Sequence, residues 1–131
     1  MRALLDTNVL FRHLTGDPPA QARRATAFLA GPHELVLADL VVAELVYVLE
    51  SFYERPRDEI ATLVRALLGL PAVTVADQDL LLRALEHYET SRLDFADSYL
   101  VAAAELWGIE RVASFDRAID RVSTVQRIEP R

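Results

Sequence analysis

Two residue types are missing from this chain of 131 amino acids, which contains no cysteine and no lysine. The absence of cysteine excludes a disulfide framework, a thiol nucleophile and a thiolate metal site. The absence of lysine excludes a P-loop lysine, a Schiff-base lysine and any mechanism that pairs a lysine with an aspartate. All 14 basic residues are therefore arginine, and several classes of enzyme are ruled out at once.

Histidine is also scarce, which limits the kinds of metal site that the chain can build. The three histidines, His13, His33 and His87, form no pair with the spacing of metal ligands. Zinc sites in proteins usually need histidine or cysteine. Any metal ion would therefore be held by oxygen ligands, which favours Mg²⁺ or Mn²⁺.

Long apolar runs and an excess of positive charge are absent too. No run reaches the roughly 18 residues of a membrane span, and Asp6 interrupts the first apolar stretch, unlike in a secretory signal. The 20 acidic residues give a net charge of -6, which excludes a basic protein that coats nucleic acid. We expect a cytoplasmic protein without membrane association, folded as a single domain over residues 1–131.

Short apolar runs alternate along the chain with longer stretches of helical spacing. Strands are predicted at residues 3–5, 34–37, 72–75, 111–114 and 124–128. Helices are predicted at residues 20–31, 40–53, 57–69, 78–90 and 95–107, with Asp39, Asp77 and Asp94 as N-caps. This alternation predicts an α/β fold with a short, mainly parallel central sheet that is flanked by helices.

Most of the 20 acids suit solvated helix faces, as predicted for Asp58, Glu59, Glu86, Glu89 and Glu105. Four others stand in unusual places. Asp6 and Asp116 each follow a predicted strand, at the sheet edge where function collects in parallel sheets. Glu44 in "LVVAELVYVL" and Asp97 in "LDFADSYLVAAAEL" lie in apolar helices, which predicts that both side chains lean inward.

Each of these acids also has an ordinary structural explanation. Asp6, Asp94 and Asp116 are each placed to cap a helix. Asp97 suits the first turn of a helix, where the dipole favours an acid, and Glu44 would be stable if an arginine paired with it. Four carboxylates brought together, however, would repel one another unless a divalent cation or a proton intervened. A cluster of them therefore predicts a metal ion.

The segments "LLDTNVL", "ADLVVAELVYVL", "LDFADSYLVAAA" and "ASFDRAID" occur in this order along the chain. Together they resemble the PIN-domain nucleases, and the layout is similar to VapC-type toxins of bacterial type II toxin–antitoxin systems. The resemblance implies a three-layer α/β/α fold and a catalytic, metal-binding quartet of Asp6, Glu44, Asp97 and Asp116. It also implies supporting roles, which orient the carboxylates, for Thr7, Asn8, Ser114 and Asp94.

The resemblance further implies an Mg²⁺- or Mn²⁺-dependent endoribonuclease that leaves a 5′-phosphate and a 3′-hydroxyl. It implies a cognate VapB-type antitoxin and a homodimer. Because RNA is a polyanion, local arginines must supply the attraction in this acidic chain, and Arg12, Arg92 and Arg117 are the predicted RNA-binding residues. The apolar side chains of residues 52–68 are predicted to serve mostly the core, with some surplus for the antitoxin or a second copy.

Two other functions are consistent with parts of this pattern. A PIN-like domain with a degenerate site would serve only as a binding partner, although all four acids of the quartet are present. A haloacid-dehalogenase-like phosphatase also begins with an aspartate after its first strand. Such a phosphatase requires a second aspartate where Asn8 stands, and a later lysine, and this chain has neither.

Overall fold

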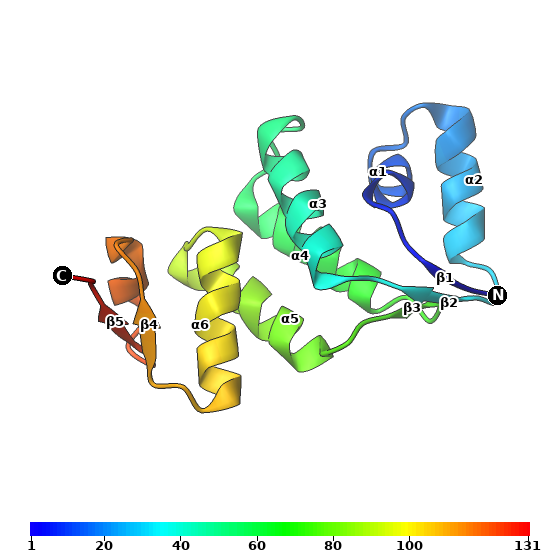
Figure 1. Cartoon of the computed structure of the whole chain (residues 1–131). Helices are drawn as coiled ribbons and strands as arrows, with labels where there is room; N and C mark the ends of the chain where they lie inside the picture. The colour runs from blue at the N-terminus through cyan, green and yellow to red at the C-terminus, as the bar shows by residue number, and fades with distance from the viewer. The chain divides into compact units, whose positions relative to one another are not determined.

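A computed structural model describes the chain over residues 1–131. The chain forms two compact units, Met1–Ala76 and Asp77–Arg131, which are drawn from blue to green and from green to red in Figure 1. None of the helices combines the length and the apolar character that a membrane crossing requires.

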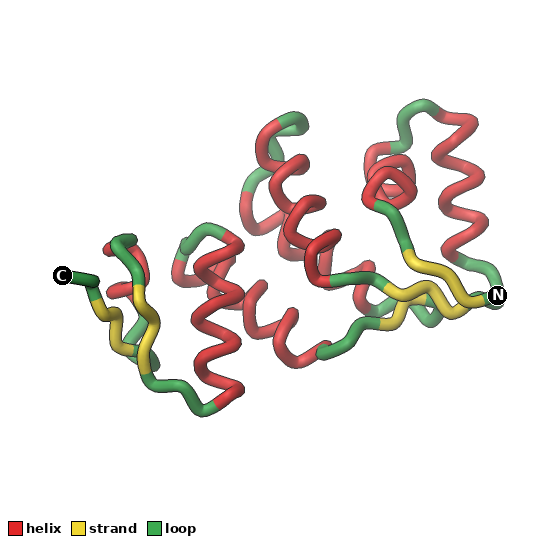
Figure 2. The backbone as a smooth tube through the Cα atoms, viewed as in Figure 1, coloured by secondary structure: helices red, strands yellow, loops and turns green.

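The first unit is built on a sheet of three parallel strands in the order β1-β2-β3. These strands are β1 (Arg2–Leu4), β2 (Glu34–Val36) and β3 (Val73–Thr74), and Figure 2 shows them side by side. The ladder continues past the strands, because Leu5 N–H donates to the Val36 carbonyl at 2.9 Å and Leu37 N–H to that of Thr74 at 2.8 Å. The three carboxyl ends therefore share one edge, and Asp6 follows the first strand at that edge.

Four helices complete the first unit: α1 (Thr7–Thr15), α2 (Pro19–Leu29), α3 (Asp39–Ser51) and α4 (Arg57–Leu68). Helix α1 packs against both α2 and α3, and α3 packs against α4. Their apolar side chains form a core together with the sheet, and Leu10, Leu35, Leu45, Ile60 and Leu67 are fully buried in it. Burial of such side chains contributes about 1.5–3 kcal/mol each.

The second unit consists of four helical segments and a pair of parallel strands. Helix α5 (Gln78–Glu86) runs into a π-helical turn, η1 (His87–Ser91), and packs against α6 (Phe95–Trp107). Strands β4 (Arg111–Ala113) and β5 (Gln126–Ile128) flank the 3₁₀ turn η2 (Arg117–Arg121). The core between them comprises Leu93, Val101, Ala104, Val112, Ile119 and Val122.

The α/β class and the parallel pairing of the strands are confirmed by these elements. Of the three predicted N-caps, the side chain of Asp77 accepts a hydrogen bond from Leu80 N–H at 3.0 Å, as expected. The prediction for Asp39 is wrong, because α3 begins one residue earlier than expected. Ala38 occupies the cap position and Asp39 is the first helical residue.

The prediction that Glu44 leans inward is also wrong, since its side chain is exposed on α3. Leu40 and Tyr47 lie on the same helix face, four residues before and three residues after it, and are 79% and 64% exposed. Apolar neighbours in the sequence therefore do not bury Glu44, because this whole face of α3 is exposed.

The opposite error concerns Glu105, which the sequence placed on a solvated helix face. The Glu105 side chain is only 14% exposed and accepts two hydrogen bonds from Arg83, at 2.9 and 2.8 Å. His87 Nε2 lies 2.8 Å from the same carboxylate. The hydrogen bond from Arg83 lowers the pKa of Glu105 to about 2, although burial opposes the shift. This ion-pair group joins α5 and η1 to α6 inside the second unit.

Candidate metal centre

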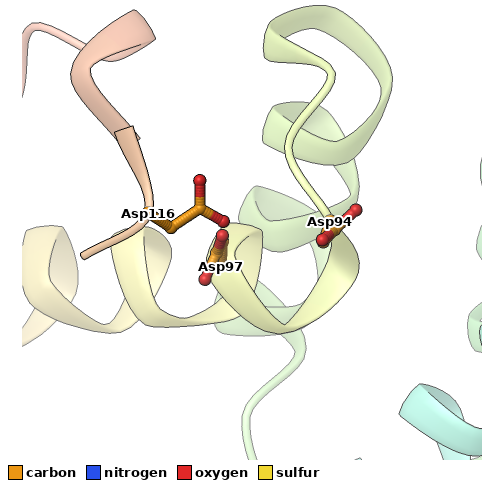
Figure 3. Close-up of side chains that lie close together, drawn as sticks. All are labelled: Asp94, Asp97 and Asp116. Carbon is orange, nitrogen blue, oxygen red and sulfur yellow. The ribbon is translucent and has the colours of Figure 1, made fainter. Parts of the chain in front are cut away.

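Three carboxylates meet in the second unit, as Figure 3 shows: Asp94, Asp97 and Asp116. We call them the acidic triad. One oxygen from each lies within 4.8 Å of the others. Two of the acids come from the start of α6, and the third precedes η2. Residues about twenty positions apart in the sequence are thus brought together by the fold.

Asp94 occupies the N-cap position of α6, yet its side chain caps no N–H group. The first turn is held by the backbone instead, since Ser98 N–H donates to the Asp94 carbonyl at 2.8 Å. The buried Ser98 hydroxyl donates to the Leu93 carbonyl at 3.3 Å. The Asp94 carboxylate is therefore not needed for capping, which was its ordinary explanation in the sequence.

Asp116 is positioned by its own turn and by the end of β4. Its carboxylate accepts the Ala118 N–H at 2.9 Å, and its backbone N–H donates to the Ser114 hydroxyl at 2.9 Å. Ser114 is in turn fixed to the C-terminal strand segment, because its N–H donates to the Ile128 carbonyl at 2.9 Å. Arg127 donates to the Ser114 carbonyl at 3.0 Å. Ser114 thus orients the segment that carries Asp116.

The two segments that carry the triad are tied together by a further hydrogen bond and by packing. Arg121, at the end of η2, donates to the Arg92 carbonyl at 2.9 Å, two residues before Asp94. Leu93 and Ile119 are both fully buried in the shared core. The separation of the carboxylates is therefore set by the core and not by exposed side chains alone.

The proximity of the carboxylates shifts the pKa values of Asp97 and Asp116. Burial, together with hydrogen bonding to Asp116 and the negative charges of Asp116 and Asp94, raises the pKa of Asp97 to about 6. The pKa of Asp116 is lowered, because its carboxylate accepts hydrogen bonds from Asp97 and from Ala118 N–H. At neutral pH a bound cation would relieve this repulsion, and a set of carboxylate oxygens suits Mg²⁺ or Mn²⁺. The residues present thus fit a divalent cation.

The other two members of the predicted quartet lie in the first unit. Asp6 is the exposed N-cap residue of α1 and makes no side-chain cap bond. Glu44 is exposed in the middle of α3. The acidic triad therefore contains Asp97 and Asp116 of the quartet, together with Asp94. The participation of Asp6 and Glu44 stays a prediction.

The polar pair after Asp6 divides into a buried and an exposed residue. Thr7 is only 2% exposed, and its hydroxyl has no hydrogen-bond partner. Asn8 is exposed on α1. A buried polar atom without a partner is rare, and a bound water or ion is one of its explanations. The Thr7 hydroxyl beside Asp6 agrees with a binding role for this strand end.

The three arginines predicted to bind RNA lie close to the predicted acids in the sequence. Arg117 is the first residue of η2, directly after Asp116, and it is exposed. Arg92 is exposed two residues before Asp94 and has left-handed backbone angles. Arg12 is half-buried in the last turn of α1. The positions of Arg92 and Arg117 flank the acidic triad on both segments.

Mg²⁺ or Mn²⁺ is expected to raise the thermal unfolding temperature of the chain at neutral pH by several degrees. A ligand that binds only the folded state stabilises it in proportion to the logarithm of its concentration over Kd. Differential scanning fluorimetry with increasing MnCl₂, against EDTA, measures the effect. The Asp116→Asn variant should show a much smaller rise. An equal rise in that variant would place the bound cation elsewhere.

The chain is similar to a known family and to a known protein. The family model described as "PIN domain" matches residues 3–125 of the chain. The VapC ribonuclease of Aquifex aeolicus (strain VF5) is 30% identical over 122 residues, which cover 91% of this chain and 90% of the relative. The family match includes every residue that the sequence assigned to the site.

Proposed function

Because the chain belongs to the PIN domain family, we propose that it is an Mg²⁺- or Mn²⁺-dependent endoribonuclease that cleaves RNA phosphodiester bonds. The observation that carries this proposal is the acidic triad, three carboxylates whose oxygens lie within 4.8 Å of one another. The name of the similar Aquifex aeolicus protein, VapC ribonuclease, supports RNA as the substrate. In this proposal the chain acts as a single domain over residues 1–131.

Asp6, Glu44, Asp97 and Asp116 would hold the cation, with Asp94 as a further carboxylate near it. When bound, the cation supplies Lewis acidity toward water and the scissile phosphate and neutralises growing negative charge. Four carboxylates without histidine or cysteine suit this class of hard cation. No lysine is required, in agreement with the composition of the chain.

The chain's own side chains have distinct tasks in this mechanism. Before a cation binds, Asp116 ionises more readily than Asp97, because hydrogen bonds from Asp97 and from Ala118 N–H to its carboxylate lower its pKa. Asp97 holds a proton on its carboxylate more readily, because its pKa is raised. Ser114 orients the Asp116 backbone, and Thr7 and Asn8 would orient Asp6 on the first strand. Such supporting groups fix the geometry of the ligands.

RNA is a polyanion and this chain is acidic overall, so arginines near the site must supply the positive charge that attracts it. Phosphate contacts dominate the affinity of proteins for nucleic acids. Arg92 and Arg117 are exposed next to members of the acidic triad in the sequence, and we assign them to phosphate contacts beside the scissile bond. Arg12 is assigned to the same task near Asp6.

The proposal includes a cognate VapB-type antitoxin, a homodimer and a cytoplasmic location. Of the apolar side chains in residues 52–68, Ile60, Val64, Leu67 and Leu68 are buried in the core. Phe52 is 73% exposed and Tyr53 is 37% exposed, and the Tyr53 ring lies 6.1 Å from that of Phe11. We therefore assign Phe52 and Tyr53, and not the helix that follows them, to contact with a partner.

Incubation of the purified chain, free of antitoxin, with total RNA is expected to give cleavage that requires Mn²⁺ or Mg²⁺. Gel electrophoresis and end mapping should show 5′-phosphate and 3′-hydroxyl products. The Asp6→Asn variant should leave the RNA intact, because one quartet carboxylate becomes a neutral amide.

Two results would contradict the nuclease. A folded, metal-loaded chain that cuts none of the RNA species would favour a degenerate PIN-like binding module. Hydrolysis of phosphate monoesters without RNA cleavage would favour the phosphatase. Isothermal titration with MnCl₂, run beside the cleavage assay, establishes that the metal is bound in the sample that is tested.

A further inference from the structure

A groove of about 430 Å³ lies between α1 and α2 in the first unit, directly after Asp6 in the chain. It is lined by Asn8, Val9, Arg12, Gln21, Arg24, Ala25 and Phe28. Its volume falls in the roughly 300–1,000 Å³ range of ligand sites. The groove is lined by polar side chains from both helices and by apolar side chains. Such a lining suits a ligand that has both charged and apolar parts.

The groove lies in a segment with a net positive charge, although the chain as a whole is acidic. Residues 7–33 contain three arginines, Arg12, Arg23 and Arg24, and only one acid, Asp17. The whole chain, by contrast, has 20 acids and 14 arginines. A locally positive segment on a negatively charged protein attracts polyanions toward that part of its surface.

The two arginines in the groove are not neutralised by carboxylates. Arg12 donates through Nε to the neutral Gln21 amide at 2.7 Å, which orients its guanidinium and leaves the terminal nitrogens for a ligand. Arg24 is exposed and makes no ion pair or hydrogen bond through its side chain. Arginines elsewhere pair with acids, as Arg55 does with Glu59 and Arg127 with Asp120. Free, oriented guanidinium groups are suited to phosphate oxygens.

The apolar wall adds a surface for a base or a sugar. Val9, Ala25 and Phe28 line the groove together with the two arginines. The Phe28 ring is held in place by stacking on His33, with ring centroids 4.6 Å apart. A fixed aromatic ring beside arginines is the arrangement with which proteins bind single-stranded nucleic acids.

We infer that the α1–α2 groove binds the phosphate backbone and one base of single-stranded RNA, with Arg12 and Arg24 on the phosphates. The inference rests on the proposed nuclease function. It assigns a path for the RNA strand along α1, which begins directly after Asp6. Two guanidinium groups without carboxylate partners and a fixed aromatic ring match the phosphates and a base of a single-stranded nucleic acid, and RNA is therefore the occupant that these side chains favour.

Arg24→Gln is expected to weaken the binding of a short, fluorescein-labelled single-stranded RNA about three- to tenfold. Anisotropy titrations in an Asp116→Asn background keep the RNA intact, since that residue lies in the proposed catalytic site. Loss of one phosphate contact should also reduce the slope of log affinity against log salt by about 0.7. Arg131→Gln removes the same charge at an exposed position outside the groove and should change neither quantity.

The possible results separate a failure of the groove inference from a failure of the nuclease proposal. If the wild-type chain cleaves RNA but Arg24→Gln and Arg12→Gln bind RNA as tightly as their background, the groove inference fails and the nuclease proposal survives. If the chain neither binds nor cleaves RNA, both fail together. Retained RNA affinity with a lost affinity for an acidic protein partner would reassign the groove to that partner. Thermal unfolding of each variant separates these results from misfolding.

Discussion

The Asp97→Asn variant is expected to cleave RNA more than about 100-fold more slowly than the wild type. This loss exceeds the loss expected when a residue that only orients a metal ligand is replaced. The amide keeps the size of the side chain but cannot supply the negative charge that a hard cation requires. Initial rates of RNA cleavage at saturating Mn²⁺ measure the effect. The stabilisation of the fold by Mn²⁺ should fall in parallel.

The stability of this variant without metal distinguishes a site residue from an ordinary helix acid. Burial and the neighbouring carboxylates raise the pKa of Asp97 to about 6. At neutral pH Asp97 is therefore mostly ionised, and its charge destabilises the folded state relative to the unfolded state. Asn at this position should therefore leave the metal-free fold as stable as before, or more stable. If the acid only interacted with the helix dipole, its replacement by Asn would instead lower the free energy of unfolding by about 0.3–1 kcal/mol.

Asp79→Asn is the matched control, because Asp79 is an exposed aspartate in the first turn of α5 in the same unit. It should retain full cleavage and the full response to Mn²⁺. If Asp97→Asn behaves like Asp79→Asn in both measurements, Asp97 does not belong to the metal site.

The second large effect is expected at Glu105, outside the metal site. Glu105→Gln should lower the free energy of unfolding by about 2–3 kcal/mol, because it leaves the buried His87 and the Arg83 guanidinium without their shared carboxylate. The value is below that of a fully buried pair, since the Arg83 side chain is one third exposed. Urea unfolding followed by circular dichroism measures it.

Glu86→Gln provides the matched control for this prediction. Glu86 pairs with the same arginine at 3.1 Å, but its side chain is 56% exposed. An exposed pair contributes little, so we expect a change within about 0.5 kcal/mol. Equal losses in the two variants would mean that burial of the Glu105 carboxylate adds nothing to the pair.

The Glu105 effect also has a defined pH dependence. The folded-state pKa is lowered from the ordinary 4.5 to about 2. The ion pair therefore stabilises the fold fully above about pH 4.5, and this contribution is lost as the pH falls toward 2. The difference between wild type and Glu105→Gln should accordingly shrink across this interval. A difference that stays constant down to the lower limit would show that charge on Glu105 is not its source.

Much of the architecture could be predicted from the sequence, because the features that define it are local. Short apolar runs and helical spacing placed five strands and most helices within a few residues of their observed bounds. The PIN-domain α/β/α fold follows from four motifs in order and is confirmed by the family match over residues 3–125. The Asp77 cap was predicted because capping depends on only four consecutive residues.

The burial of individual acids could not be predicted, because it depends on contacts between distant residues. Glu105 is buried by Arg83, 22 positions away, and by His87, 18 positions away. Glu44 was predicted to lean inward from its apolar neighbours, yet that face of α3 is exposed. Sequence neighbours report the composition of a helix, whereas burial depends on which face another element covers.

The sequence by itself determined the chemistry available to this protein: carboxylates without lysine or cysteine, and therefore oxygen ligands for a hard cation. The sequence also identified Asp94, Asp97 and Asp116 as candidates. It left two roles open for Asp94, as the N-cap of a helix or as a residue of the site. Only the tertiary structure brought the three within 4.8 Å, with no side-chain cap at Asp94. It alone revealed the groove that joins Arg12 to Arg24. Distances of this kind arise from packing of the core, which no local pattern encodes.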